Sequence, residues 1–197
     1  MGMLALEKLR TPAQVQDFLN SLPFNFEKRG ETHRSVAEAL KAGEAHCFEG
    51  ALIAAATLQQ QGERPLLLDL KAARPDFDHV VALFKEGKLW GAISKTNHAT
   101  LRYREPVYAS VRELAMSYFN EYFLENGQKT MRSFSTKPFD LRKFGNTWLT
   151  STENLAYIAH VLDKAPHTQV ITSTQVKKLR KADKVERRTL GIEEWKS

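Results

Sequence analysis

Hydrophobic positions in the first part of the chain recur with helical spacing. Thr11 and Pro12 give a capping residue followed by a proline at the first helical position, and the apolar residues that follow predict an amphipathic helix over residues 12–22. Ser35 and Glu38 have the spacing of a capping box and predict a second, shorter helix. The chain therefore begins with two helices joined by a loop.

The next pattern is a long apolar helix followed by three strands. Residues 45–60 are rich in alanine and leucine and are apolar on most faces, so this helix is expected to be buried. The short apolar run 65–70 follows a proline and is typical of a central strand. Residues 79–84 and 89–94 predict two further strands, and the tight turn at Gly87 makes them antiparallel neighbours.

The second half of the chain adds further elements. Pro106 excludes a helix and predicts an extended segment over residues 101–107. Ser110 is a candidate cap for a helix over residues 111–122. The remaining predictions are a strand over 129–135, a helix over 152–163, a β-branched extended segment over 169–173 and a charged helix over 174–188.

Charge is distributed unevenly along the chain. The 197 residues carry a formal net charge of +6. Residues 175–197 hold eight Lys and Arg against four Asp and Glu, so the body of the chain is close to neutral. We expect a single α+β domain over residues 1–174, followed by a basic tail over residues 175–197 that is helical or mobile. Binding of nucleic acid is expected only through this tail.

The only cysteine, Cys47, excludes an internal disulfide framework and a zinc site built from several cysteines. A free thiol suits a reducing compartment, and neither a signal sequence nor an apolar run of about 20 residues is visible. We therefore expect a cytoplasmic protein without a membrane partner. Glycine-rich phosphate loops are absent, and Asp76, Asp78 and His79 lack a further ligand at metal-binding spacing. No cofactor and no metal are expected.

The candidate chemistry starts from Cys47, which lies in the first turn of the third predicted helix. Free backbone N–H groups and the helix dipole favour a thiolate there, and His79 is a candidate base or imidazolium partner. A third group has to fix the tautomer of the imidazole, and Ser94, Asn97 and Asp69 are the candidates. The backbone N–H of Cys47 is a candidate donor to an oxyanion. The alternative is a small buried cysteine with no chemical role.

The order of these residues resembles the transglutaminase-like superfamily, which shares the papain-like fold. In that family a cysteine at the start of a buried helix is followed by a histidine on one strand and an aspartate on the next, often shortly after a tryptophan. Cys47 and His79 match the first two residues, and the run from Trp90 to Ser94 matches the third strand. The resemblance covers about residues 30–105. It implies a bacterial branch of the superfamily, with the cysteine helix packed on an antiparallel sheet.

The resemblance also implies an activity. Cys47 would be the nucleophile and His79 the base of an enzyme that transfers or hydrolyses an acyl group of a small molecule or peptide, from an amide, ester or thioester. Ser94 stands where the family has its aspartate, and a serine has no charge to stabilise an imidazolium. Asn97 is an alternative orienting group, as in papain-like proteases, although it lies three residues later and on the opposite face of a regular strand.

Two arginines and two other functions complete the set of hypotheses. Arg102 and Arg104 alternate with Leu101 and Tyr103, so both face one side of an extended segment and are candidates for binding a substrate carboxylate or phosphate. The alternative for them is a solvated face or ion pairs with nearby acids. For the whole chain, Ser94 favours a module that keeps the fold without catalysis, and the basic tail leaves nucleic-acid association open.

Overall fold

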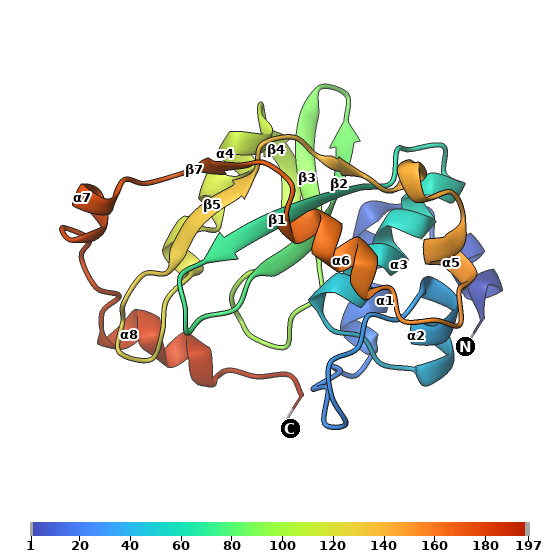
Figure 1. Ribbon diagram of the computed structural model, residues 1–197, viewed down its shortest axis with the longest axis horizontal. Coiled ribbons are helices and arrows are strands. Elements are labelled where there is room, and N and C mark those ends of the chain that lie inside the picture. The colour runs from blue at the N-terminus through green and yellow to red at the C-terminus, as the bar shows by residue number, and fades with distance from the viewer. Residues whose placement is uncertain (1, 196–197) are drawn as a thin grey trace.

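One antiparallel sheet with helices on both faces organises the fold (Figure 1). The structure is a computed structural model that describes residues 2–195. The strands follow the spatial order β4-β3-β2-β1-β5-β7, and the short strand β6 pairs with β1. Their bounds are β1 Leu66–Ala72, β2 His79–Glu86, β3 Leu89–Ser94, β4 Arg104–Tyr108, β5 Met131–Ser135, β6 Phe139–Asp140 and β7 His167–Gln169.

The helices fall into a long buried one and several shorter ones. The α-helices are α1 Pro12–Ser21, α2 Val36–Ala42, α3 Cys47–Gln60, α4 Val111–Ser117, α5 Thr147–Thr150, α6 Ala156–Asp163, α7 Ser173–Val176 and α8 Lys184–Arg187. Short 3-10 helices span Met3–Lys8, Phe119–Glu121, Leu141–Phe144 and Arg188–Gly191. The helices and strands predicted for the first hundred residues all form, which confirms the α+β class and the antiparallel arrangement.

Alternating side chains of the central strands fill a core on each face of the sheet. Leu67 and Ala82 belong to the core that includes residues of α1, α2 and α3. Leu68 and Val81 belong to the core on the α4 side. Because both faces are covered, β1 and β2 are nearly continuous apolar runs, which is why the sequence predicts them as central strands.

Helix α3 is buried along most of its length and packs across β2. Gly50 in its second turn allows a close approach to the segment after β3, because a Cβ at this position would lie 2.3 Å from the Cβ of Lys95. Any larger residue would push the start of α3 away from the end of β3. This contact therefore fixes the spacing between two elements that carry candidate site residues, Cys47 and Ser94.

Lys95 also ties the end of β3 to α1. Its side chain is fully buried, and its ammonium donates to the carbonyl oxygens of Leu19 and Leu22 at 2.9 and 2.5 Å. Carbonyls at the end of a helix lack intrahelical partners and favour a cation. Burial lowers the pKa of Lys95 to about 8. The residue after Ser94 is thus held between two helices.

Two predicted helices have different bounds. The helix expected over residues 111–122 ends at Ser117 and is followed by a 3-10 turn. The helix expected over residues 152–163 begins only at Ala156, because the side chain of Asn154 accepts the Ala156 N–H at 2.8 Å and holds the preceding residues in a turn.

The predictions for residues 169–173 and 174–188 are wrong in detail. The strand lies earlier, as β7, and the charged helix is replaced by the single turns α7 and α8. Thr172 and Asp183 each cap one of these turns with their side-chain oxygens. Between these two turns Ala182 is the one buried residue. The segment therefore buries too little apolar surface to stabilise a continuous helix.

Residues 192–195 lie against the loop that follows β3. The N–H of Ala99 donates to the carbonyl oxygen of Ile192 at 3.1 Å, and the N–H of Glu194 donates to that of Asn97 at 2.8 Å. The side-chain amide of Asn97 donates to the carbonyl oxygen of Trp195 at 3.3 Å. Residues 192–195 of the predicted basic tail therefore lie in contact with the domain. Within the described part of the chain, every helix is too short or too polar to span a bilayer.

Candidate active site

Glu49 organises the start of α3. Its carboxylate is fully buried and accepts the backbone N–H groups of Arg34 and His46, each at 3.2 Å. It also accepts the amide of Asn25 and the hydroxyl of Thr32, each at 3.1 Å. These bonds attach the loop after α1 to the first turn of α3. The sequence analysis did not single out Glu49, although its place three residues after the helix cap is the signal of a capping box.

His46 is the N-cap of α3, so Cys47 is the first helical residue, as predicted. The Nδ1 atom of His46 accepts the N–H of Phe48 at 3.3 Å, and Nε2 donates to the carbonyl oxygen of Thr32 at 2.8 Å. With one nitrogen accepting and the other donating, the ring is the neutral Nε2–H tautomer in this arrangement. The cap places an imidazole directly beside the thiol.

His79 and Ser94 meet at the ends of two neighbouring strands. The register pairs Val81 of β2 with Ser94 of β3, so His79 lies diagonally across from Ser94 on the same face of the sheet. The Nε2 atom of His79 is 2.7 Å from the hydroxyl of Ser94, whose proton goes to the carbonyl oxygen of Leu101 at 2.5 Å. The hydroxyl therefore accepts the Nε2 proton, which leaves Nδ1 of His79 for the thiol of Cys47.

Two imidazoles and the helix start make Cys47 acidic. Burial by itself raises the pKa of the thiol, but hydrogen bonds to His46 and His79 and the positive charges on these rings lower it from 9.0 to about 5. A pKa lowered in this way favours the thiolate, which is the nucleophilic form of a cysteine. The structure thus brings together the cysteine, the histidine and the serine that the sequence proposed, and it adds His46.

The charge state of His46 is linked to its role as a cap. Burial lowers its pKa, while the hydrogen bond and charge of Cys47, the charge of Glu49 and the Thr32 carbonyl raise it, to about 9. A protonated Nδ1 has no lone pair for the Phe48 N–H. His46 can therefore either cap the helix or pair with the thiolate through Nδ1. His79, whose Nε2 proton is held by Ser94, has no such conflict.

Cys47 is reached through a cleft of about 800 Å³. The thiol residue is partly exposed on the wall of this cleft, and His79 is buried behind it. The remaining walls come from the loop after α1, the ends of β1 and β2, and one face of α6. The lining residues are Glu27, Glu31, His33, His46, Cys47, Phe48, Asp69, Lys71, Arg74, Phe77, Asp78, Val80, Ala156, Ala159, His160, Leu162 and Asp163.

An ion-pair network spans one end of the cleft. Lys71 of β1 lies 3.2 Å from Asp69 and 2.7 Å from Asp78, and it also pairs with Asp163 at the end of α6. Nε2 of His167 donates to Asp69 at 3.1 Å, and this bond raises the pKa of His167. The network joins α6 to the sheet across the cleft. Asp69, a candidate third member of the site, is therefore engaged by Lys71 and His167.

The other predicted site residues lie in structural contacts. The side chain of Asn97 donates to Trp195, as described above, and it is Ser94 that meets His79. Arg102 donates to the carbonyl oxygen of His98 at 2.7 Å and pairs with Glu194 at 3.3 Å. Arg104 pairs with Glu121 at 2.6 Å. For both arginines the structure thus shows the ion pairs that the sequence left open as the alternative to substrate binding.

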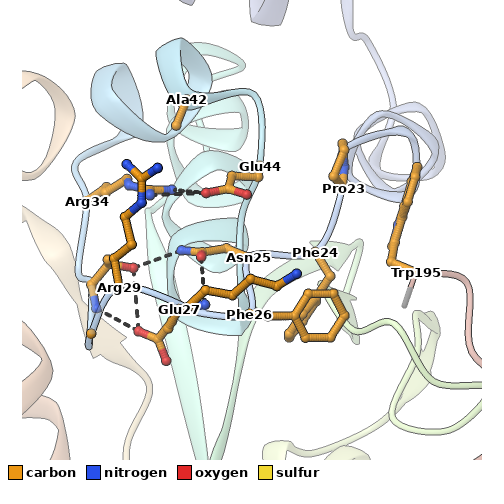
Figure 2. Close-up of a pocket in the computed structure, with 13 residues that line it drawn as sticks. Pro23, Phe24, Asn25, Phe26, Glu27, Arg29, Arg34, Ala42, Glu44 and Trp195 are labelled. Atoms are coloured by element: carbon orange, nitrogen blue, oxygen red, sulfur yellow. Dashed lines mark hydrogen bonds and ion pairs between the residues drawn. The ribbon is translucent and has the colours of Figure 1, made fainter. Parts of the chain in front are cut away.

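A second pocket, of about 540 Å³, has a different character (Figure 2). Glu27 lines both pockets, so the loop after α1 forms a wall between them. Figure 2 shows Arg34 paired with Glu44 at 3.1 Å, the side-chain oxygen of Asn25 accepting the N–H of Glu27 at 3.0 Å, and Trp195 beside Pro23. The described residues that line it include no cysteine, histidine or serine, so this pocket offers charge pairs without a thiol or an imidazole.

Within residues 2–195, no group of three or more His, Cys, Asp and Glu side chains is arranged to hold a metal ion.

No protein-family model matches the chain, and no curated protein sequence is similar to it. The chemistry of the site is therefore inferred from its own geometry.

Proposed function

We propose that this protein is a thiol-dependent acyl-transfer enzyme that acts on an amide, ester or thioester through an acyl-enzyme. One observation carries the proposal: Cys47 lies on the wall of a cleft, at the start of a helix, beside two imidazoles that lower its pKa. A cysteine that only fills space in a core has a raised pKa and no access to solvent. These features support a nucleophilic role for Cys47.

The proposed reaction begins with attack of the Cys47 thiolate on the acyl carbon. The electron pair of the carbonyl moves to its oxygen, and the backbone N–H of Cys47, which has no intrahelical acceptor at this position, donates to that oxyanion. The bond to the leaving group then breaks, and the imidazolium of His79 gives its Nδ1 proton to the departing amine, alcohol or thiol. The product of this half-reaction is a thioester on Cys47.

The second half-reaction releases the acyl group. Water or an amine attacks the thioester, His79 takes the proton of the attacking group, and Cys47 leaves as a thiolate, which completes the cycle. Ser94 holds the Nε2 proton of His79 throughout, so that Nδ1 always faces the sulfur. Hydrolysis and transfer differ only in which nucleophile reaches the acyl-enzyme.

The broader assignments follow from the same site. The order Cys47, His79, Ser94 on a helix and two antiparallel strands supports a transglutaminase-like, papain-like arrangement in which serine replaces the acidic residue. We take the substrate to be a small molecule or peptide with a reactive acyl group, and no cofactor is needed. A thiolate nucleophile works best in a reducing compartment, so we place the enzyme in the cytoplasm.

Two other functions compete with this one. The neutral Ser94 in place of an acid favours a binding module that has kept the fold and lost catalysis. The exposed cations of the tail favour association with nucleic acid. Arg180 pairs with Asp183 and Glu186, but most of the other cations have no carboxylate of the described residues within ion-pair distance. Neither alternative explains why a thiol at the start of a helix lies on the wall of a cleft beside two imidazoles.

Covalent labelling tests the proposal directly. The full chain, incubated with a panel of acetyl and peptidyl thioesters and p-nitrophenyl esters, is expected to gain one acyl group on Cys47, detected by mass spectrometry of the intact protein and its peptides. The label is expected to disappear with time as the acyl-enzyme turns over. Cys47→Ala is the control, because equal labelling of this variant would show that the acyl group goes elsewhere. A stable label without turnover would favour the inactive binding module.

A further inference from the structure

Leu101 adopts a backbone conformation that leucine rarely adopts. Its φ angle is +59°, in the left-handed region where the Cβ of a non-glycine residue meets its own carbonyl oxygen. Such a conformation persists only where the surrounding contacts fix it, and it is found preferentially at functional sites. Leu101 lies in the loop between β3 and β4, and its carbonyl oxygen is the acceptor for the Ser94 hydroxyl.

Hydrogen bonds hold Leu101 on both sides of its Cα. On one side the carbonyl oxygen accepts from Ser94 at 2.5 Å. On the other side the backbone N–H donates to a carboxylate oxygen of Glu121 at 2.7 Å. The Glu121 bond fixes the peptide that precedes Leu101, and the left-handed φ then directs the carbonyl toward Ser94. The position of this carbonyl thus depends on a carboxylate outside the cleft.

Glu121 is itself held in place by Arg104. The second carboxylate oxygen of Glu121 pairs with the guanidinium of Arg104 at 2.6 Å. Arg104 also donates to the hydroxyl of Ser117 at 2.9 Å and lies 4.0 Å from the centre of the Tyr118 ring. Planar stacking and several hydrogen bonds leave the guanidinium little freedom to move. The ion pair is therefore a rigid anchor on the α4 side of the sheet.

We propose that Glu121, held by Arg104, is a positioning residue for His79. It acts through Leu101 and Ser94: the Glu121 carboxylate fixes the Leu101 peptide, the Leu101 carbonyl fixes the Ser94 hydroxyl, and the hydroxyl holds the Nε2 proton of His79. A hydroxyl has no charge, and it orients an imidazole only if its own acceptor is fixed. In this way the chain makes up for the missing acid at position 94. The inference rests on the proposed function, because it assigns Glu121 to the same site.

The test measures the ionisation of Cys47 rather than turnover. The rate of alkylation by iodoacetamide is followed against pH in the wild type, Glu121→Ala, Glu121→Gln and Glu105→Ala. Glu105 is the matched control, because it is an exposed carboxylate next to Arg104 on the same strand. Glu121→Ala is expected to slow alkylation at pH 5 about fivefold, which corresponds to a rise of about one unit in the thiol pKa. Glu121→Gln keeps an oxygen for the Leu101 N–H and is expected to lie in between.

The outcomes separate the positioning role from the proposed function. A shifted pH midpoint in both Glu121 variants, with none in Glu105→Ala, supports the inference. A lower melting temperature with an unchanged midpoint shows a structural role only and overturns it, provided that Ser94→Ala does shift the midpoint. If Ser94→Ala and His79→Gln also leave the pH midpoint of alkylation unchanged, the result contradicts the proposed function as well as the positioning role of Glu121. Should Glu121→Ala not fold, Glu121→Gln decides between the first two outcomes.

Discussion

His79→Gln is expected to slow the alkylation of Cys47 by iodoacetamide about a hundredfold at pH 6. The imidazole of His79 supplies a hydrogen bond and a positive charge that lower the pKa of the thiol, and without them burial raises that pKa toward or above its ordinary value. Each unit of increase costs about tenfold in thiolate at a pH below the new pKa. Turnover is expected to fall by about 10²–10⁴, the usual contribution of a general acid and base.

His46→Asn is the matched control for this experiment. Asparagine is a good N-cap and keeps an acceptor for the Phe48 N–H, so the variant removes the imidazole of His46 while α3 stays capped. Because the proposed mechanism uses His79 for proton transfer, His46→Asn is expected to retain turnover, although the thiol pKa also rises when the hydrogen bond and charge of His46 are lost. The reverse result, with activity lost in His46→Asn and kept in His79→Gln, would make His46 the base.

Glu49→Ala is expected to lower the free energy of unfolding by about 3–5 kcal/mol, because several donors lose their acceptor and each unsatisfied buried donor costs about 1–3 kcal/mol. The carboxylate is fully buried and accepts bonds from four different residues, and its loss leaves their donors without partners in the interior. The loop after α1 and the first turn of α3 would then separate. Because this turn carries Cys47, the variant is also expected to lose the low thiol pKa.

Urea unfolding of the full chain measures the first effect. Glu63→Ala is the control, since Glu63 is an exposed carboxylate just beyond the other end of α3, and its removal is expected to change stability by less than about 0.5 kcal/mol. A loss in Glu49→Ala no larger than that of Glu63→Ala would contradict the role assigned to the buried carboxylate.

The part of the site that lies on regular elements was predictable from sequence. The position of Cys47 could be predicted because it lies at the start of a helix with a clear apolar pattern. The positions of His79 and Ser94 could be predicted because they lie on two strands joined by a tight turn. Once the turn fixes the register, residues near the open ends of the two strands lie close together. The closeness of the cysteine and the histidine could therefore be predicted from sequence, with Ser94 as one of three candidates for the third member of the site.

The choice among those candidates depended on contacts between distant segments. Leu101 accepts from Ser94 only because its backbone is left-handed, and no local pattern predicts that conformation for a leucine. Asn97 is held by Trp195 from the far end of the chain, a partner that spacing does not reveal. The place of His46 beside the thiol depends on its role as the N-cap, in which it has extended backbone angles and its side chain accepts from the Phe48 N–H.

The two arginines show the same limit. Alternation correctly places Arg102 and Arg104 on one side of an extended segment, but their partners, Glu194 and Glu121, come from elements far along the chain. The sequence shows where each positive charge lies and which side of the segment it faces, but it does not show which acidic residue pairs with it. The prediction of a charged helix in the tail was wrong for a related reason. The segment has no apolar face to pack on the domain, and caps at Thr172 and Asp183 divide it into two separate turns.

Titration of the single thiol is the most direct test of the central claim, that Cys47 is an ionised nucleophile. Absorbance of the thiolate near 240 nm, followed from pH 3 to 10 in the full chain with Cys47→Ala as the blank, reports one group because the protein has one cysteine. The thiolate signal is expected to appear as the pH rises through about 5 and to be lost below it. A midpoint near the ordinary value of 9.0 would contradict the proposed chemistry of the site.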